Sequence, residues 1–290
     1  MGVFSDVENF IGEKIITTVS QWGGCINDSY QITTLTNKSF FLKTNKNAPA
    51  DMFPMEAKGL EDIRSIKVLS TPKVLLVNAH FLLLEFIEVQ KKTPIFFQTF
   101  GKLLARHHQI SAAYWGYSSD NYIGANRQVN PSIPYQQENA SKDWAQFYFE
   151  NRILYQLKLA EKKQLSDATL SHLISKLEPN IPEILAPGCE PPALLHGDLW
   201  GGNFLITHHH SPVMIDPAVY YGHREADLAM TKLFGGFSSD FYNAYNETYP
   251  LKPGYEYREN LYHLYHVMNH LNLFGKSYYN RCIQLIQSYL

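Results

Sequence analysis

LLHGDLWGGNFLIT (residues 194–207) and VMIDPA (residues 213–218) are the two stretches that say most about how this chain folds. The apolar runs FLI and VMI inside them predict two short strands joined by a turn. Such a hairpin would set Asn203, at the start of the first strand, beside Asp216, just after the second. Asp198 lies five residues before Asn203, so three polar side chains would meet at one end of the hairpin.

These three side chains have the chemistry and the spacing that a phosphoryl-transfer site requires. Asp198 could accept the proton of an attacking hydroxyl group, while Asn203 and Asp216 could hold Mg²⁺ under the phosphates. Oxygen ligands, without Cys or a compact His cluster among them, favour Mg²⁺ over Zn²⁺. The alternative is a polar turn without a chemical role.

The composition of the 290 residues favours a small-molecule partner. Basic and acidic residues nearly balance, at 25 and 27, so nothing indicates nucleic acid or an anionic membrane. The three cysteines, Cys25, Cys189 and Cys282, are odd in number and widely spaced, which fits a reducing cytosol better than a disulfide framework. No apolar run approaches the roughly 20 residues of a membrane span. We expect a cytoplasmic protein; the oligomeric state stays open, with a monomer as one option.

The N-terminal segment predicts a helix at 7–15, followed by β-prone runs on both sides of Gly23 and Gly24. Two glycines allow the backbone to approach an anion closely, and the N–H groups that follow could bind phosphate. The alternative is an ordinary hairpin turn. Cys25 in the same loop could be a thiol that oxidises readily and makes activity redox-dependent, or a small residue that merely fits.

Lys43 and Glu56 are predicted to form an ion pair at the phosphate site. Lys43 ends a strand, and Glu56 falls in a predicted helix at 52–66 with Leu60 and Ile63 on the same face. A carboxylate on a buried face is costly unless it is paired. Lys43 is the obvious partner, and pairing would hold its ammonium group at the phosphates.

Two further strand-like runs, TPKVLLV and HFLLLEFIE, complete a small β-rich lobe. After them, Glu85, Phe86 and Ile87 belong to a hinge whose main chain could meet the adenine edge of ATP. Amphipathic runs beyond it predict helices. The fold class is therefore α+β, a bilobal fold with an ATP-binding lobe at 1–88 and a mainly helical catalytic and acceptor-binding lobe at 89–290.

The spacing after Asp216 separates this chain from kinases that modify proteins. Only ten residues lie between Asp216 and Asp227, which leaves little room for an activation segment that cradles a peptide. Gly197 stands where protein kinases commonly carry an Arg that pairs with a phosphate on that segment, so control by phosphorylation is not expected. Asp227 is predicted to accept hydrogen bonds from the catalytic-loop main chain, in preference to a direct chemical role.

Residues near the loop are candidates for binding the acceptor. Trp200 could stack on a sugar or on its attached amine. Tyr221, His223 and Glu225 could line the same groove, with Glu225 offering charge to a cationic amine, and loop packing is the alternative. The turn-rich segment 116–134 could form a wall of the groove or a plain surface loop.

Histidines recur at helical spacing near the C terminus, at His263, His266 and His270. No third ligand accompanies His266 and His270, so hydrogen bonding at the groove wall, together with Asn269 and Asn272, is preferred over a metal site. The run at 208–210 falls in the hairpin turn and is expected to face solvent.

Beyond these separate features, the chain resembles the fructosamine kinase (ketosamine 3-kinase) family, within the aminoglycoside and choline kinase-like, protein kinase-like superfamily. The resemblance runs nearly end to end and rests on long motifs. These are GGCIND, FFLKTN, MFPMEAKGL, LLLEF, DNYIG, LLHGDLWGGN, IDPAVYYGHREADLAMTKLFGGF and LYHLYHVMNHLNLFG. Gly202 is a departure, since many relatives carry Ser nearby, and it leaves every predicted ligand in place.

The resemblance implies ATP-dependent phosphorylation of the 3-hydroxyl of a ketosamine, the adduct of a reducing sugar with an amine. Phosphorylated adducts fall apart, which amounts to protein deglycation. It also implies that Lys43 and Glu56 position phosphate, that Asp198 is the base, and that Asn203 and Asp216 bind Mg²⁺. Two alternatives stay open: a kinase for another small acceptor, such as an amino sugar or a choline-like alcohol, and a non-catalytic nucleotide-binding protein.

Overall fold

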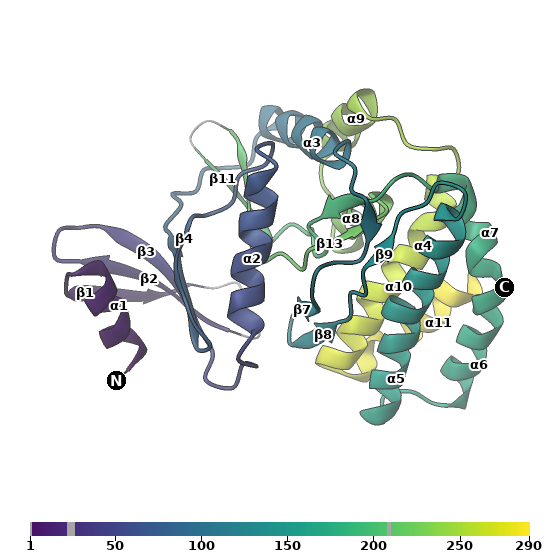
Figure 1. The fold of residues 1–290 in the computed structure, drawn as a ribbon, viewed down its shortest axis with the longest axis horizontal. Coiled ribbons are helices and arrows are strands. Elements are labelled where there is room, and N and C mark those ends of the chain that lie inside the picture. Colours follow the sequence, from purple (N-terminus) through teal and green to yellow (C-terminus); the bar gives the residue numbers. More distant parts are fainter. Residues whose placement is uncertain (1, 22–26, 208–209) are drawn as a thin grey trace.

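The structure is a computed structural model that describes residues 2–21, 27–207 and 210–290. Figure 1 shows an antiparallel sheet at the N-terminal end, a group of helices at the C-terminal end, and α2 between them. The strands are β1 Ile15–Ser20, β2 Asp28–Thr34, β3 Ser39–Thr44, β4 Val74–Val77, β5 Phe81–Glu85, β6 Tyr114–Trp115, β7 Asn121–Ile123, β8 Asn126–Gln128, β9 Ile133–Pro134, β10 Ala193–Leu195, β11 Phe204–Ile206, β12 Pro212–Met214 and β13 Tyr220–Gly222. The helices are α1 Val3–Ile11, α2 Met52–Ser65, α3 Pro94–His108, α4 Ala140–Tyr148, α5 Tyr155–Lys162, α6 Ala168–Leu177, α7 Ile181–Leu185, α8 Glu225–Leu233, α9 Ser239–Thr248, α10 Tyr255–Phe274 and α11 Tyr279–Gln287.

The N-terminal sheet has five strands in the order β1-β2-β3-β5-β4, all antiparallel. Successive side chains of a strand point to opposite faces, and β5 uses both faces. Phe81 and Leu83 pack on one side with α1, whereas Leu82 and Leu84 pack on the other side against α2. The continuous apolar run of β5 therefore results from burial on two sides.

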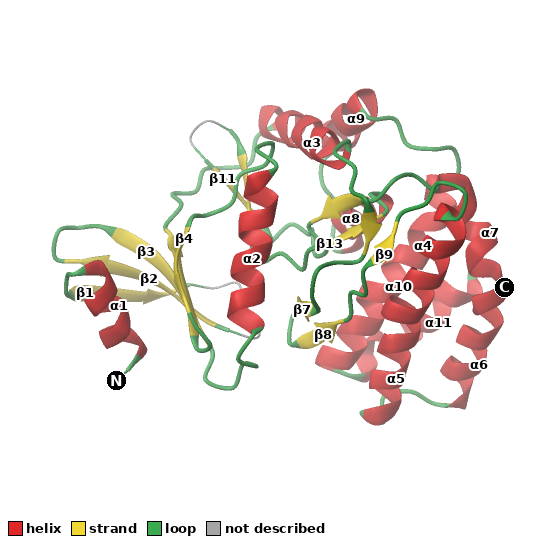
Figure 2. Ribbon diagram, in the orientation of Figure 1, coloured by secondary structure: helices red, strands yellow, loops and turns green. Residues whose placement is uncertain are grey.

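The C-terminal part is mainly helical and contains the large hydrophobic core (Figure 2). Its long central helix, α10, is buried along most of its length. Helices α4 and α5 are joined by a π-helical stretch at Phe149–Leu154. Arg152 in that stretch is buried with its guanidinium group over the rings of Phe147 and Tyr220. The two parts together confirm the predicted α+β class, and a lobe boundary at residue 88 remains a prediction.

The predicted first helix is shifted in the structure. We expected it at 7–15, but α1 ends at Ile11 because Gly12 follows with φ 71°, the left-handed conformation of a helix C-cap. Ile15 instead begins β1 and pairs with Thr34. The apolar residues of α1 and the β-branched residues of β1 are close in the sequence, and only Gly12, Glu13 and Lys14 lie between the two elements.

Helix α2 is attached at both ends to the segment that precedes and forms β7. At its N-terminal end, Asp51 accepts a hydrogen bond of 2.5 Å from the Tyr122 hydroxyl. Toward its C-terminal end, the Tyr117 hydroxyl donates to Asp62, and Lys58 donates to the same hydroxyl oxygen at 2.8 Å. These contacts cross from the sheet side of the molecule to the helical side.

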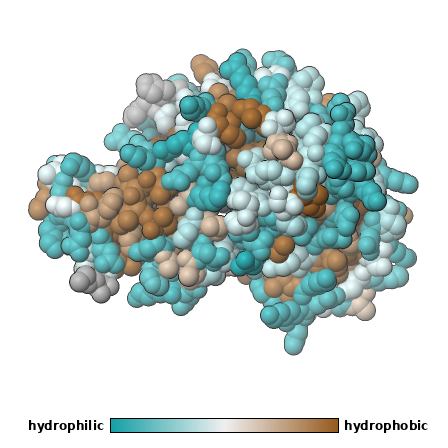
Figure 3. Space-filling model, viewed as in Figure 1, coloured by the Kyte–Doolittle hydropathy of each residue, from teal (hydrophilic) through white to brown (hydrophobic). Residues whose placement is uncertain are grey.

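Within the described residues, no helix combines the length and the apolar character that crossing a bilayer requires. On the face seen in Figure 3, hydrophilic residues cover most of the helical part, and hydrophobic residues gather in smaller groups.

Candidate functional site

Asp227, in the first turn of α8, holds the loop between β10 and β11. The carboxylate of Asp227 accepts hydrogen bonds from the main-chain N–H groups of His196, at 2.7 Å, and Gly197, at 2.8 Å. His108 lies 3.4 Å from the same carboxylate. Asp227 therefore makes the main-chain contacts that the sequence predicts for it.

Gly197 adopts φ 81°, and a Cβ atom there would lie 2.0 Å from the carbonyl oxygen of Ala218. A larger residue would have to push the two chain segments apart, because a backbone oxygen cannot move aside independently. This glycine lets the loop pass close to the segment that follows Asp216, so that Asp198 and Asp216 can line the same cavity.

Asp198 and Asn203 are bonded to each other across the loop. The Asn203 amide nitrogen donates to the main-chain oxygen of Asp198 at 2.8 Å and to its carboxylate at 3.1 Å. Because the amide nitrogen is used in this way, the side-chain oxygen of Asn203 is left as a ligand atom. Burial and the charge of Asp216 raise the pKa of Asp198 to about 7, although the Asn203 hydrogen bond opposes the shift.

Asp216 follows the β11–β12 hairpin in a left-handed conformation, with φ 55°. This region is uncommon for a residue other than glycine, and such strain is often found at functional sites. The N–H group of the preceding residue, Ile215, donates to the carbonyl oxygen of Asn203 at 3.1 Å. The hairpin thus holds Asn203 and Asp216 side by side, as its sequence predicts.

Lys43 joins the sheet to this loop. Its ammonium group lies 2.7 Å from Glu56 of α2 and 2.5 Å from Asp216, and its side chain is 5% exposed. Burial alone would lower the pKa of Lys43, but the two carboxylates outweigh it and raise the pKa above its usual value. The predicted Lys43–Glu56 pair is therefore present, and it includes Asp216.

Two cavities meet at Lys43 and Asp216, which line both of them. The smaller cavity, of about 210 Å³, is also lined by Glu85, Phe86 and Ile87, the residues predicted to form a hinge. Gly23, Gly24 and Cys25 lie outside the described residues.

The larger cavity, of about 580 Å³, contains Asp198 and Asn203 and is lined by Trp200 as predicted. Most of its remaining wall comes from two places that are far apart in sequence. The hairpin of β7 and β8 contributes Asn121–Gly124, and the end of α10 with the turn after it contributes Asn269, His270, Leu273, Phe274 and Tyr278. Within the turn-rich segment 116–134, the part at Asn121–Gly124 thus lines the cavity.

The prediction that Tyr221, His223 and Glu225 line the acceptor groove is wrong, because none of the three lines the larger cavity. Tyr221 packs its ring on Tyr114, at 4.9 Å between centroids, and on Tyr117. His223 and Glu225 are buried. The alternative considered for these residues, packing within the protein, is what the structure shows.

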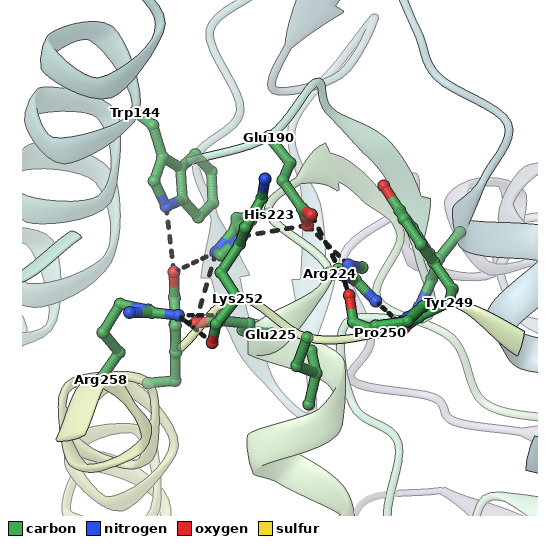
Figure 4. Close-up of polar contacts among 12 residues, drawn as sticks. Trp144, Glu190, His223, Arg224, Glu225, Tyr249, Pro250, Lys252 and Arg258 are labelled. Atoms are coloured by element: carbon green, nitrogen blue, oxygen red, sulfur yellow. Dashed lines mark hydrogen bonds and ion pairs between the residues drawn. The ribbon is translucent and has the colours of Figure 1, made fainter. Parts of the chain in front are cut away.

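His223 and Glu225 belong to a separate network of buried charges, shown in Figure 4. Glu225 receives two hydrogen bonds from Arg258, at 2.7 and 2.5 Å. His223 lies 2.7 Å from the Tyr262 hydroxyl. Arg224, between them in sequence, bonds Glu190 at 2.6 Å. Closeness to Asp216 in sequence was the only signal for these residues, and β13 carries them away from the cavity.

The C-terminal histidines are also divided between the cavity and the interior. His270 lines the larger cavity, whereas His263 and His266 are buried within the helical part. Burial lowers the pKa of His266 to about 3, with a smaller contribution from His270. The described residues contain no group of three or more His, Cys, Asp or Glu side chains that could hold a metal ion. Of the residues expected at a hydrogen-bonding wall, Asn269 and His270 line the larger cavity, whereas His266 and Asn272 are not among its described lining residues. Of the run at 208–210, the first two residues lie outside the described part of the chain, and His210 is exposed.

Comparison with known proteins identifies the family to which the chain is similar. The sequence profile of the fructosamine kinase family matches residues 7–290. A chloroplastic protein-ribulosamine 3-kinase of Arabidopsis thaliana is 38% identical over 275 residues, covering 92% of this chain and 81% of the relative.

Solved structures agree with the sequence match. A candidate fructosamine-3-kinase from Thermobifida fusca has a TM-score of 0.87 at 30% identity, covering 99% of this chain and 98% of that chain. The choline kinase LicA from Streptococcus pneumoniae has a TM-score of 0.66 at 16% identity, covering 99% and 98%, and that likeness concerns the fold alone. The chain therefore has a protein kinase-like fold and belongs to the fructosamine kinase family.

Proposed function

We propose that this protein transfers the γ-phosphoryl group of ATP to the 3-hydroxyl group of a ketosamine, of the fructosamine or ribulosamine type. The observation that carries the proposal is the pair of cavities that share Lys43 and Asp216. The hinge residues line only the smaller cavity and Asp198 lines only the larger one. This division supports ATP in the smaller cavity and the sugar in the larger one, with the transferred group at their junction.

The residues at the junction fit Mg²⁺ by their donor set. Asn203 presents an amide oxygen and Asp216 a carboxylate, and these oxygen ligands suit a hard cation held jointly with phosphates. Burial raises the pKa of Asp198, and the negative charge of Asp216 adds to the shift. When bound, Mg²⁺ would offset the charge of the phosphate oxygens. Lys43, held by Glu56, would add a positive charge to the same phosphates.

Asp198 is proposed as the group that accepts the proton of the attacking hydroxyl. The acceptor oxygen forms a bond to the γ-phosphorus, the bond from phosphorus to the β–γ bridging oxygen breaks, and ADP leaves. Holding both substrates in place can contribute about 7–11 kcal/mol, and a general base typically adds about 10²- to 10⁴-fold. Positioning by the two cavities is therefore the larger contribution.

The test is a screen of acceptors with Mg·ATP, using fructosyl, ribulosyl and erythrulosyl amines beside choline and an amino sugar. We expect ADP release with a ketosamine and a phosphate on carbon 3, assigned by NMR. Preferential phosphorylation of choline or the amino sugar would replace the proposed acceptor. ATP binding without any phosphorylated product would favour the non-catalytic alternative. A ketosamine product that then decomposes would support a role in deglycation, for which the near balance of charge and the few cysteines favour the cytoplasm.

A further inference from the structure

Asn269 lies on α10 in the wall of the larger cavity and is 2% exposed. A buried amide of this kind has to satisfy an oxygen acceptor and two N–H donors. Its side-chain oxygen accepts two hydrogen bonds, from Asn126 at 2.8 Å and from Gln156 at 3.3 Å. Both donors are themselves buried amides, so their orientation decides which atom Asn269 turns toward them.

A lysine fixes the orientation of the first donor. Lys163 donates to the side-chain oxygen of Asn126 at 3.3 Å, and it is anchored by the main-chain oxygen of Asn272 at 2.7 Å. An ammonium group can only donate, so the oxygen of Asn126 must face Lys163. The amide nitrogen of Asn126 is then left to face Asn269.

A main-chain carbonyl fixes the orientation of the second donor. The Asn272 amide nitrogen donates to the main-chain oxygen of Gln156 at 2.9 Å and to its side-chain oxygen at 2.7 Å. Since a carbonyl can only accept, the nitrogen of Asn272 must face Gln156. The Gln156 side chain then turns its own nitrogen toward Asn269.

Both chains of hydrogen bonds therefore end on the oxygen of Asn269, and its amide nitrogen is directed away from them. Among the residues that the structure describes, no hydrogen bond from this nitrogen is present, while the residue lines the larger cavity. This nitrogen is not among the fully buried polar atoms that lack a partner, so it stays open to the cavity. A molecule bound there that displaces water from it has to supply an acceptor group, because an unpaired buried donor is costly.

We propose that Asn269 is a specificity-determining residue whose amide nitrogen donates a hydrogen bond to a hydroxyl oxygen of the sugar. The proposal rests on the proposed function and assigns one more contact to the same cavity. A sugar hydroxyl has the lone pair that this donor needs. A protonated amine has none, so the amine end of the acceptor is excluded from this position. Asn269 thereby orients the sugar as well as selecting it.

The experiment compares the parent enzyme with Asn269→Asp, measured with a fructosyl amine and with analogues that each lack one hydroxyl group other than the 3-hydroxyl. The carboxylate of the variant can still accept from Asn126 and Gln156, but it presents an acceptor to the cavity. We expect kcat/KM for the full ketosamine to fall by about 10- to 100-fold, with the KM for ATP unchanged. One deoxy analogue should lose a similar factor with the parent and nothing further with the variant, as a double-mutant cycle requires.

Three outcomes would overturn the assignment: a variant that keeps the parent's preference for every hydroxyl, an effect on the KM for ATP instead, or full activity in Asn269→Asp. Thermal melting controls for folding. If Asn269→Asp does not fold, the exposed residue Lys163 is changed instead. Lys163→Met removes the hydrogen bond that fixes the orientation of Asn126. A rise in the KM for the acceptor alone supports the inference, and an unchanged KM contradicts it. A parent enzyme inactive on every ketosamine would instead refute the proposed function.

Discussion

The charges around Lys43 and the charges around Arg258 are both buried, yet they are organised differently. In the Arg258 network, Glu225 is matched by Arg258 and Glu190 by Arg224, and the remaining guanidinium N–H groups donate to main-chain oxygens, such as that of Pro250 at 2.7 Å. Each of the two carboxylates, Glu225 and Glu190, is thus matched by a guanidinium group of the protein.

At the junction of the cavities, the charges do not balance. Lys43 is the only lysine or arginine among the described residues that line either cavity. It already pairs with Glu56 and Asp216, and Asp198 adds a third carboxylate. The difference teaches that burial and charge do not identify a binding site by themselves. An imbalance of charge that faces a cavity does identify a binding site, because only a ligand can neutralise it.

Of the changes that test this comparison, the largest loss of activity is expected at Asp198. Asp198→Asn keeps the size of the side chain and removes its ability to accept a proton, so turnover should fall by about 10²- to 10⁴-fold. Stability should not fall, because the change removes a buried carboxylate that lies near Asp216. Steady-state kinetics and thermal melting check both parts. Full activity would remove Asp198 from the mechanism.

The opposite result is expected in the Arg258 network. Glu225→Ala leaves Arg258 buried without its partner and should lower the free energy of unfolding by about 3–5 kcal/mol. The folded enzyme should keep a kcat close to that of the parent, measured well below the melting temperature. Glu256→Ala, an exposed residue on the same helix as Arg258, is the matched control and should change stability by about 0.5 kcal/mol or less. A large loss of kcat with little loss of stability would assign Glu225 to the site after all.

Lys43 should behave as a member of the site and not of the network. Lys43→Met removes a charge-assisted contact to phosphate, and the KM for ATP should rise by about 10- to 100-fold. The KM for the acceptor should change much less, since Asp198 and Asn203 stay in place. Kinetics with each substrate varied in turn separate the two constants. Equal effects on both would argue that the two cavities do not hold different substrates.

Trp200 tests the wall of the larger cavity with a smaller effect. Trp200→Ala removes a ring that packs edge-on against Phe234, at 6.5 Å between centroids, and the KM for the ketosamine should rise by about 2- to 10-fold. The KM for ATP serves as the internal control. If the acceptor KM is unchanged, the indole is a structural residue.

The smallest effect concerns the pH dependence of the network. Burial raises the pKa of Glu190, but the nearby His223, 3.7 Å away, and the hydrogen-bonded Arg224 outweigh it and lower the pKa to about 2. A lowered pKa in the folded state contributes stability above the unfolded value of about 4.5, and that contribution is lost as pH falls toward 2. Glu190→Gln should therefore melt below the parent at pH 7, with the difference shrinking between about pH 5 and pH 2. A constant difference would mean that the charge of Glu190 does not contribute.

The sequence predicts the charged centre because its residues belong to local patterns. A five-residue spacing and a short hairpin bring Asp198, Asn203 and Asp216 together, and a carboxylate on the buried face of α2 requires a cation such as Lys43. The cavity wall is different. Asn121 and Asn269 come from distant segments, and only the packing of α10 behind the β7–β8 hairpin brings them to one place.

His223 and Glu225 show the opposite case, in which residues near the site in sequence lie away from it in space. They follow Asp216 closely in the sequence, but β13 pairs with β10 and directs them into the interior. Closeness in sequence to a cavity residue such as Asp216 therefore overestimates how many of its neighbours line the same cavity. No pattern in the sequence distinguishes Glu225 from Glu56, since each precedes apolar residues on a helix.

The attachment of α2 to the segment of Tyr117 and Tyr122 bears on how the enzyme is switched on. In protein kinases the position of the helix that carries the glutamate partner of the lysine controls activity. Here α2 is hydrogen-bonded near both ends to the segment of Tyr117 and Tyr122, an arrangement that should hold Glu56 beside Lys43. Such an enzyme needs no activating partner for this step, and its rate in the cell should follow the supply of substrates.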